Sequence, residues 1–157
     1  MFVPRVRCDA CVKTDAVLPS FLFRGRLDAV ASVGAVLEEV VSGVGGVRPA
    51  AARAEIPHTT ARGWVRRFAS RAKHWSVAFA ALAVELGGEV IVAVADGATH
   101  ALRAIGAAFG AAASHAGWAA IGAWAFASAV SGGGLLATNT NAPYLIVGRR
   151  RFMHPVP

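Results

Sequence analysis

Residues 57–73 carry the sequence pattern that most limits how this chain can fold. Ala61, Trp64, Val65 and Phe68 follow one another at the spacing i, i+3, i+4 and i+7. Side chains at this spacing share one face of an α-helix, so we expect that face to be buried. Cations occupy the positions between them and must therefore point away from the core. The pattern predicts an amphipathic helix that forms one wall of a helical domain.

Two segments before this helix also have helical patterns. Residues 26–43 place apolar or small side chains three and four positions apart, and glycines at and after Gly43 provide an end. Residues 48–55 are Ala-rich and form a short helix candidate. Pro57 interrupts this candidate, because the residue before a proline is disfavoured in the helical region. The sequence thus predicts a short helix, a tight turn and then the amphipathic helix.

The second half of the chain is poor in charge and rich in alanine. No charged residue occurs between Arg103 and Arg149. Alanine is the strongest helix former, and helices are expected at 96–117, with Asp96 as a cap, and at 118–134. Residues 73–88 either extend or follow the amphipathic helix. We therefore predict an all-α fold, in which a helix-turn-helix bundle is joined to additional Ala-rich C-terminal helices and has irregular termini.

Positive charge is concentrated in one stretch of the sequence. The chain has a formal net charge of +7, and residues 48–73 hold seven Lys or Arg side chains against one acid, Glu55. This excess indicates a polyanionic partner, either nucleic acid or an acidic membrane surface. A DNA-binding helix-turn-helix requires two helices joined by a tight turn, with the second helix exposing a polar face. The sequence favours double-stranded DNA as the partner.

Three segments also resemble a known family. They read RVRCDACVKTDAVLPSFL at 5–22, RLDAVASVGAVLEEV at 26–40 and PHTTARGWVRRFASRA at 57–72, and GGGLLATNTNAPYLIVGRRRFMHPVP at 132–157 is similar to the way such proteins end. The family is an uncharacterised group of bacterial proteins, often associated with transposons, that join a small zinc ribbon to a helix-turn-helix. The resemblance implies sequence-directed DNA binding in a mobile-element or regulatory setting and implies no known reaction.

The resemblance also has departures. Cys8 and Cys11 form one Cys-x-x-Cys pair, which supplies half of a tetrahedral zinc shell. Typical family members carry another pair upstream, so the resemblance implies a truncated half ribbon. Zinc would then bind only if another chain completed the site, and two free thiols are the alternative. The family usually has glycine at the position of Glu55 and larger aliphatic residues at Ala50 and Ala54, which predicts a weaker first helix here.

Individual roles follow from the helix-turn-helix geometry. The N-terminal residues of the second helix reach base edges, so His58, Thr59 and Arg62 are candidates for base contacts, and the guanidinium of Arg62 suits a guanine. The candidates for phosphate contacts are Arg48, Arg66, Arg67, Arg71 and Lys73. A solvated helix surface is the alternative for each cation. Trp64 and Phe68 are expected to be core anchors rather than base-stacking side chains.

The chain divides into four predicted parts. Residues 1–19 form a residual half zinc-ribbon segment, 20–75 the helix-turn-helix domain, 76–131 an Ala/Gly-rich helical region and 132–157 an irregular basic tail. The N-terminal residues lack the apolar core of a secretory signal, so we expect a cytoplasmic protein. The sequence leaves open whether a homodimer reaches paired half-sites.

The sequence also bears on two other classes of protein, a membrane protein and an enzyme. Residues 104–130 are long enough and sufficiently uncharged to span a bilayer, with basic residues from Arg149 beside them. Ala and Gly partition weakly into hydrocarbon, however, and His115 would lie near the middle, so a membrane partner is not favoured. The sequence contains neither GxSxG nor HExxH and no recognisable set of catalytic acids. We therefore expect a non-catalytic protein with no cofactor.

Overall fold

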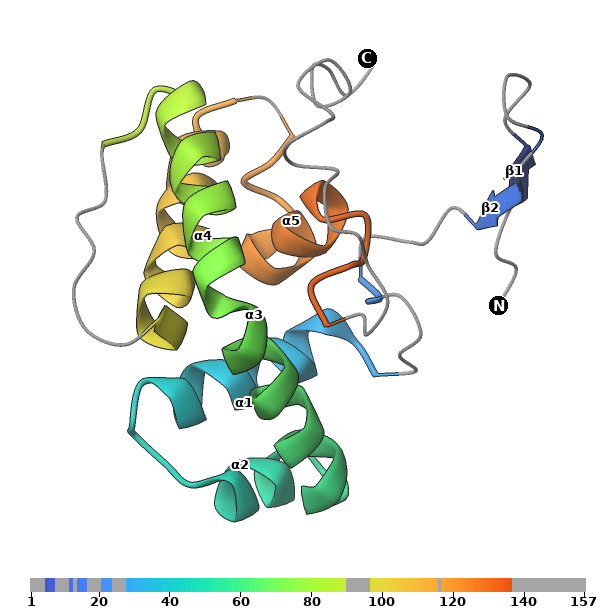
Figure 1. Ribbon diagram of the computed structural model, residues 1–157, viewed down its shortest axis with the longest axis vertical. Helices are drawn as coiled ribbons and strands as arrows, with labels where there is room; N and C mark the ends of the chain where they lie inside the picture. Colours follow the sequence, from blue (N-terminus) through green and yellow to red (C-terminus); the bar gives the residue numbers. More distant parts are fainter. Residues whose placement is uncertain are drawn as a thin grey trace.

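The computed structural model describes residues 5–7, 12, 14–16, 21–23, 28–89, 97–115 and 117–136. Five helices account for most of these residues, so the fold is all-α, as predicted (Figure 1). The helices are α1 (Val30–Val41), α2 (Val47–Arg53), α3 (His58–Glu85), α4 (Gly97–Ala113) and α5 (Gly122–Val130). One pair of short strands precedes them in the chain.

Helix α3 is the central element of the fold. It is 28 residues long and continues without a break through the predicted boundary between residues 75 and 76. Figure 1 shows α1 and α2 beside its first half and α4 beside its second half. Its N-cap is Pro57, one position outside the helix, whereas the sequence placed this proline near the first helical position. One helix therefore runs through both the predicted helix-turn-helix domain and the predicted Ala/Gly-rich helical region.

Helix α4 runs in the same direction as α3. Its first residue, Gly97, accepts a hydrogen bond of 3.3 Å through its carbonyl from the Ser76 hydroxyl. Near its other end, Ala111 lies so close to Gly88 that a methyl group on this glycine would be 3.0 Å from the Ala111 Cβ. Small side chains permit this approach, since α4 buries Ala101, Ala104, Ala108 and Ala112 on one face.

A single apolar core connects the helices. Its largest fully buried side chains come from segments far apart in sequence, among them Phe23, Trp64, Phe79, Phe126 and Leu135. The described part of the uncharged run thus contributes to the core and avoids burying charges without partners.

Helix α5 is shorter than the sequence predicted. The structure begins it at Gly122, and residues 117–121 form turns that contain Gly117 at a φ of 87°. Gly122 itself has a φ of 76°, a conformation that glycine adopts at little cost. Glycine within an Ala-rich pattern therefore ends regular structure here, which a helical pattern alone does not reveal. Asp96, the predicted cap of α4, lies outside the described residues.

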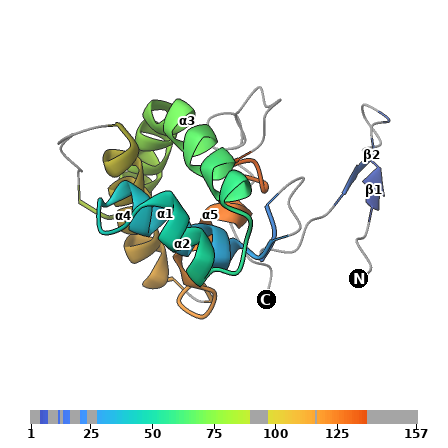
Figure 2. The same ribbon diagram turned by 90° about the horizontal axis from the view of Figure 1, so that it is seen from below.

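The N-terminal segment contains a feature that the sequence did not predict. Strands β1 (Arg5–Arg7) and β2 (Thr14–Ala16) pair in antiparallel fashion, with Val6 opposite Asp15. Both views show this pair apart from the helices (Figures 1 and 2). Three residues are too few for an alternating pattern to be recognised in a sequence. Cys8 and Cys11 and residues 137–157 of the predicted tail lie outside the described residues.

Candidate nucleic-acid interface

A tight turn of four residues joins α2 to α3. The Glu55 and Ile56 N–H groups donate to the carbonyls of Ala52 and Ala51, at 3.2 and 3.0 Å. This pair of hydrogen bonds is the Schellman motif, which requires a left-handed residue at its centre. Glu55 takes that place with a φ of 55°, and Ile56 packs against the core. The backbone of the turn is thus fixed even though the residue at its centre is not glycine.

Two aromatic side chains anchor the first half of α3. Trp64 and Phe68 are both 0% exposed, which confirms the prediction that they are core residues. Ala61 is also fully buried and Val65 packs against the core from the edge of this face. Because α3 is a rigid helix, burial of this face determines which residues point outward.

The opposite face of α3 is exposed and cationic. Its members are spaced three or four residues apart, and we call them the cationic face: Thr59, Arg62, Arg66, Ser70 and Lys73. All five are exposed, as is His58 at the start of the helix. Within α3, all of which is described, no acidic residue lies between Thr59 and Lys73. The cationic face therefore presents three positive side chains and two hydroxyl groups to any partner.

Sequence reasoning missed Ser70 as a member of this face. Its hydroxyl donates a 2.9 Å hydrogen bond to the Arg67 carbonyl, so the side chain lies close to the helix between neighbouring cations. Its position four residues after Arg66 and three before Lys73 is the signal that could have identified it. Arg48, a predicted phosphate contact outside α3, is exposed near the start of α2.

Two predicted phosphate contacts are less exposed than we expected. Arg67 and Arg71 are half-buried, and each takes part in an interaction within the chain. The Arg67 guanidinium lies over Gly63, where an added methyl group would come within 2.9 Å of it. Both residues are one helical step away from the cationic face, at the edge where α3 meets its neighbours. Residue type alone did not distinguish this edge from the centre of the exposed face.

Burial also affects the histidine beside Arg71. His74 is half-buried, and its ring meets Trp75 edge-on with 4.8 Å between the ring centroids. Loss of solvent and, secondarily, the positive charge of Arg71 lower the pKa of His74 below its ordinary value of about 6.5. A neutral His74 is therefore favoured in the folded protein.

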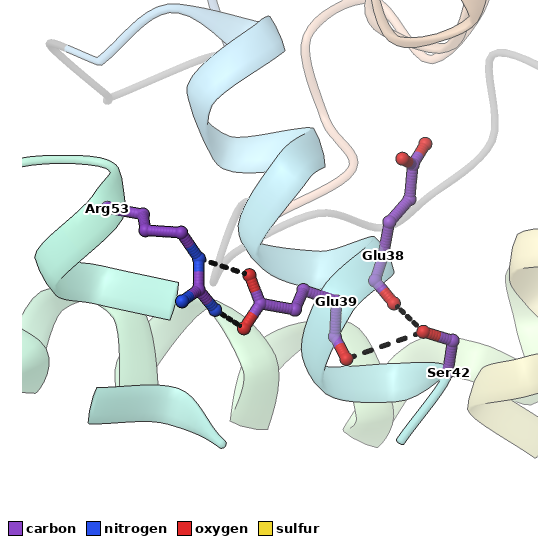
Figure 3. A network of polar contacts seen from close by, with 4 residues as sticks. All are labelled: Glu38, Glu39, Ser42 and Arg53. Carbon is purple, nitrogen blue, oxygen red and sulfur yellow. Dashed lines mark hydrogen bonds and ion pairs between the residues drawn. The ribbon is translucent and has the colours of Figure 1, made fainter. Parts of the chain in front are cut away.

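Polar contacts hold the two helices before α3 in place. Figure 3 shows Arg53 of α2 with its guanidinium directed at both carboxylate oxygens of Glu39 on α1. The Arg53 Nε donates at 3.1 Å, and the Arg53 side chain is 62% exposed against 19% for Glu39. Glu38, next to it, instead accepts a 2.7 Å hydrogen bond from the Trp124 indole of α5. The two adjacent carboxylates thus contact different helices.

A close packing contact accompanies this link. The Trp124 ring covers Gly34 of α1 so tightly that a methyl group there would be 2.2 Å from a ring carbon. Gly34 is buried, and its lack of a side chain is what lets the ring approach. The contacts of Trp124 with Glu38 and Gly34 therefore join α5 to α1.

The predicted metal site remains a prediction. Among the described residues, no three His, Cys, Asp or Glu side chains come together as metal ligands. Cys8 and Cys11, the two residues of the predicted half site, are not among them.

Residues 104–130, the segment that the membrane alternative requires to span the bilayer, include parts of two helices. Within 104–130, α4 ends at Ala113 and α5 begins at Gly122. No helix in the described ranges combines the length and the apolar character needed to cross a bilayer.

Compared with known proteins, the chain matches no family model, no curated protein and no solved structure.

Proposed function

We propose that this protein binds double-stranded DNA without catalysis and places the first half of α3 in the major groove. The observation that carries the proposal is the opposition of two faces on one helix: Trp64 and Phe68 are fully buried while Arg62, Arg66 and Lys73 are exposed. An α-helix fits the major groove, and cations around it would neutralise phosphates. The short α2 and the fixed turn before α3 support the arrangement of a helix-turn-helix.

Roles within this interface follow from position along α3. His58, Thr59 and Arg62 belong to the first turns of the helix, which reach base edges in this binding mode. Arg62 would donate two hydrogen bonds to one guanine. Arg66, Lys73 and Arg48 would contact phosphates, since all three are exposed. Arg67 and Arg71 would contact phosphates only at the edge of the interface, because their side chains are half-buried.

The length of the cationic face limits the DNA segment that one molecule would read. From Thr59 to Lys73 the helix rises about 21 Å, at 1.5 Å per residue. Base pairs are stacked 3.4 Å apart, so this length corresponds to about six base pairs. One α3 would therefore specify a consensus of at most about six base pairs, and a longer consensus would require a second copy of the protein.

Selection of bound sequences from random duplex DNA tests the proposal. The expected result is enrichment of a short consensus, either alone or as two related half-sites. Binding that decreases steeply with salt but enriches no sequence would reduce the proposal to non-specific DNA binding. No binding at low salt would contradict it.

A further inference from the structure

Three helices end on the same backbone motif, and one of them differs in the residue at its centre. Helix α3 ends with Gly87 at a φ of 81° and α5 with Gly132 at a φ of 58°. In both, the following residue donates a hydrogen bond to a carbonyl five positions back, as Gly88 does to Ala83. Helix α2 ends in the same way, but its left-handed residue is Glu55. The other two ends have glycine at this position, so the presence of a charged side chain at Glu55 raises the question of what its carboxylate does.

The charge of Glu55 is unusual for its position. It is the one acid among the residues from 48 to 73, against seven cations, and it is exposed. Four chain steps separate it from Thr59, so their Cα atoms lie at most about 15 Å apart. This limit is comparable to the Debye length of about 10 Å at moderate salt. At low salt the carboxylate would therefore repel phosphates that approach the start of α3, and this repulsion would be largely screened at high salt.

We propose that the charge of Glu55 lowers the affinity of the protein for DNA of every sequence. The inference rests on the proposed function. Its carboxylate would reduce the sequence-independent electrostatic attraction that the cations supply, while the preference among sites would still be set by the base contacts of Arg62 and its neighbours. Because this repulsion acts equally on correct and incorrect sites, it leaves the ratio of their affinities unchanged and shortens the time that the protein stays at any site.

The test separates charge from backbone conformation by two matched pairs. Glu55→Gln removes the charge of the natural residue, while Glu55→Asp and Glu55→Asn differ only in charge and share a side chain that tolerates the left-handed region. Binding of each protein to a labelled random-sequence duplex is measured by fluorescence anisotropy at about 50 and 200 mM salt. Each neutral variant is expected to bind about twofold to fivefold tighter than its charged counterpart at low salt, and this ratio is expected to shrink at high salt.

Glu89→Gln provides the control. Glu89 is an exposed acid just beyond the far end of α3, about 40 Å from the start of the helix, and its neutralisation is expected to leave affinity unchanged. Equal affinities within both matched pairs would overturn the inference and leave the proposed function intact, provided that the natural protein binds DNA in a salt-dependent way. A natural protein that binds no duplex would overturn both.

Discussion

The two halves of α3 share one buried face but differ in their outer faces. Toward the core, Trp64 and Phe68 in the first half are followed by Trp75 and Phe79 in the second, all 3% exposed or less. Toward solvent, the cationic face ends at Lys73. Beyond it the exposed positions are Val77, Ala81, Val84 and, at the end of the helix, the acid Glu85. The buried face determines where α3 packs, whereas the cationic residues of the outer face are confined to the first half of the helix.

The largest expected effect contrasts a buried with an exposed residue of α3. Trp64→Ala should lower the free energy of unfolding by about 3–5 kcal/mol, because it removes a fully buried indole and leaves a cavity. Val77→Ala, in the second half, should change it by less than about 0.5 kcal/mol, since Val77 is 63% exposed. Urea unfolding measures both. Similar costs for the two variants would contradict the described orientation of α3.

Trp64→Phe refines this prediction. The Trp64 indole N–H is buried, and the described residues offer it no hydrogen-bond acceptor. Phenylalanine would remove this unsatisfied donor at the expense of some volume, so its cost should be well below that of alanine.

Next in size are the effects on DNA binding. Arg62→Ala should reduce the preference for one base by about 1–3 kcal/mol, because the guanine loses the hydrogen bonds that the Arg62 guanidinium donates. Arg66→Ala should instead weaken binding to all sequences alike and reduce the salt slope by roughly one unit.

Arg103→Ala is the matched control for both variants, since Arg103 is an exposed arginine on α4 beside the second half of α3. Competition binding with a selected site and its single-base variants distinguishes the three. If Arg103→Ala weakened binding as much as Arg66→Ala, the difference between the halves of α3 would have no functional meaning.

The left-handed residues on either side of α3, Glu55 at the end of α2 and Gly87 at the end of α3, provide a smaller effect on stability. Glu55→Gly should raise the free energy of unfolding by about 1 kcal/mol, because a side chain at a φ of 55° is strained where glycine is not. Gly87→Ala, at the end of the second half, should lower it by a similar amount for the same reason. Thermal unfolding of the two variants would show shifts in opposite directions. Shifts of the same sign would mean that the two helix ends are not equivalent.

The smallest expected effect concerns His74, where the two halves meet. Its pKa is lowered in the folded protein, chiefly by loss of solvent, so the unfolded chain binds a proton more readily. The stability that a neutral His74 contributes is complete above a pH of about 6.5 and is lost as pH falls below that value. Urea unfolding of His74→Gln should show a weaker decrease of stability between pH 7 and 5. An unchanged pH dependence would contradict this assignment.

Periodicity explains which parts of the interface could be predicted. The burial of Trp64 and Phe68 and the exposure of Arg62 and Arg66 both follow from the spacing of residues along one helix, which a sequence displays directly. Arg67 and Arg71 were placed outward wrongly, because they occupy the border between the two faces. The position of that border depends on neighbouring helices that the sequence does not place.

Contacts between distant segments could not be predicted at all. Glu39 and Arg53 are 14 residues apart, and the Trp124 indole reaches Glu38 across 86 residues. Adjacent glutamates in a sequence resemble a solvated surface until the helices that contact them are known. The approach of Trp124 to Gly34 depends in the same way on how α1 and α5 pack.

The central claim is that the burial of Trp64 and Phe68 turns the cationic face toward solvent, where it can bind DNA. The salt dependence of DNA binding tests this claim most directly. The protein is compared with a variant in which Arg62, Arg66 and Lys73 are all replaced by Gln, after thermal unfolding has shown that both are folded. The slope of log affinity against log salt should become shallower by about two to three units. An unchanged slope in the folded variant would contradict the claim.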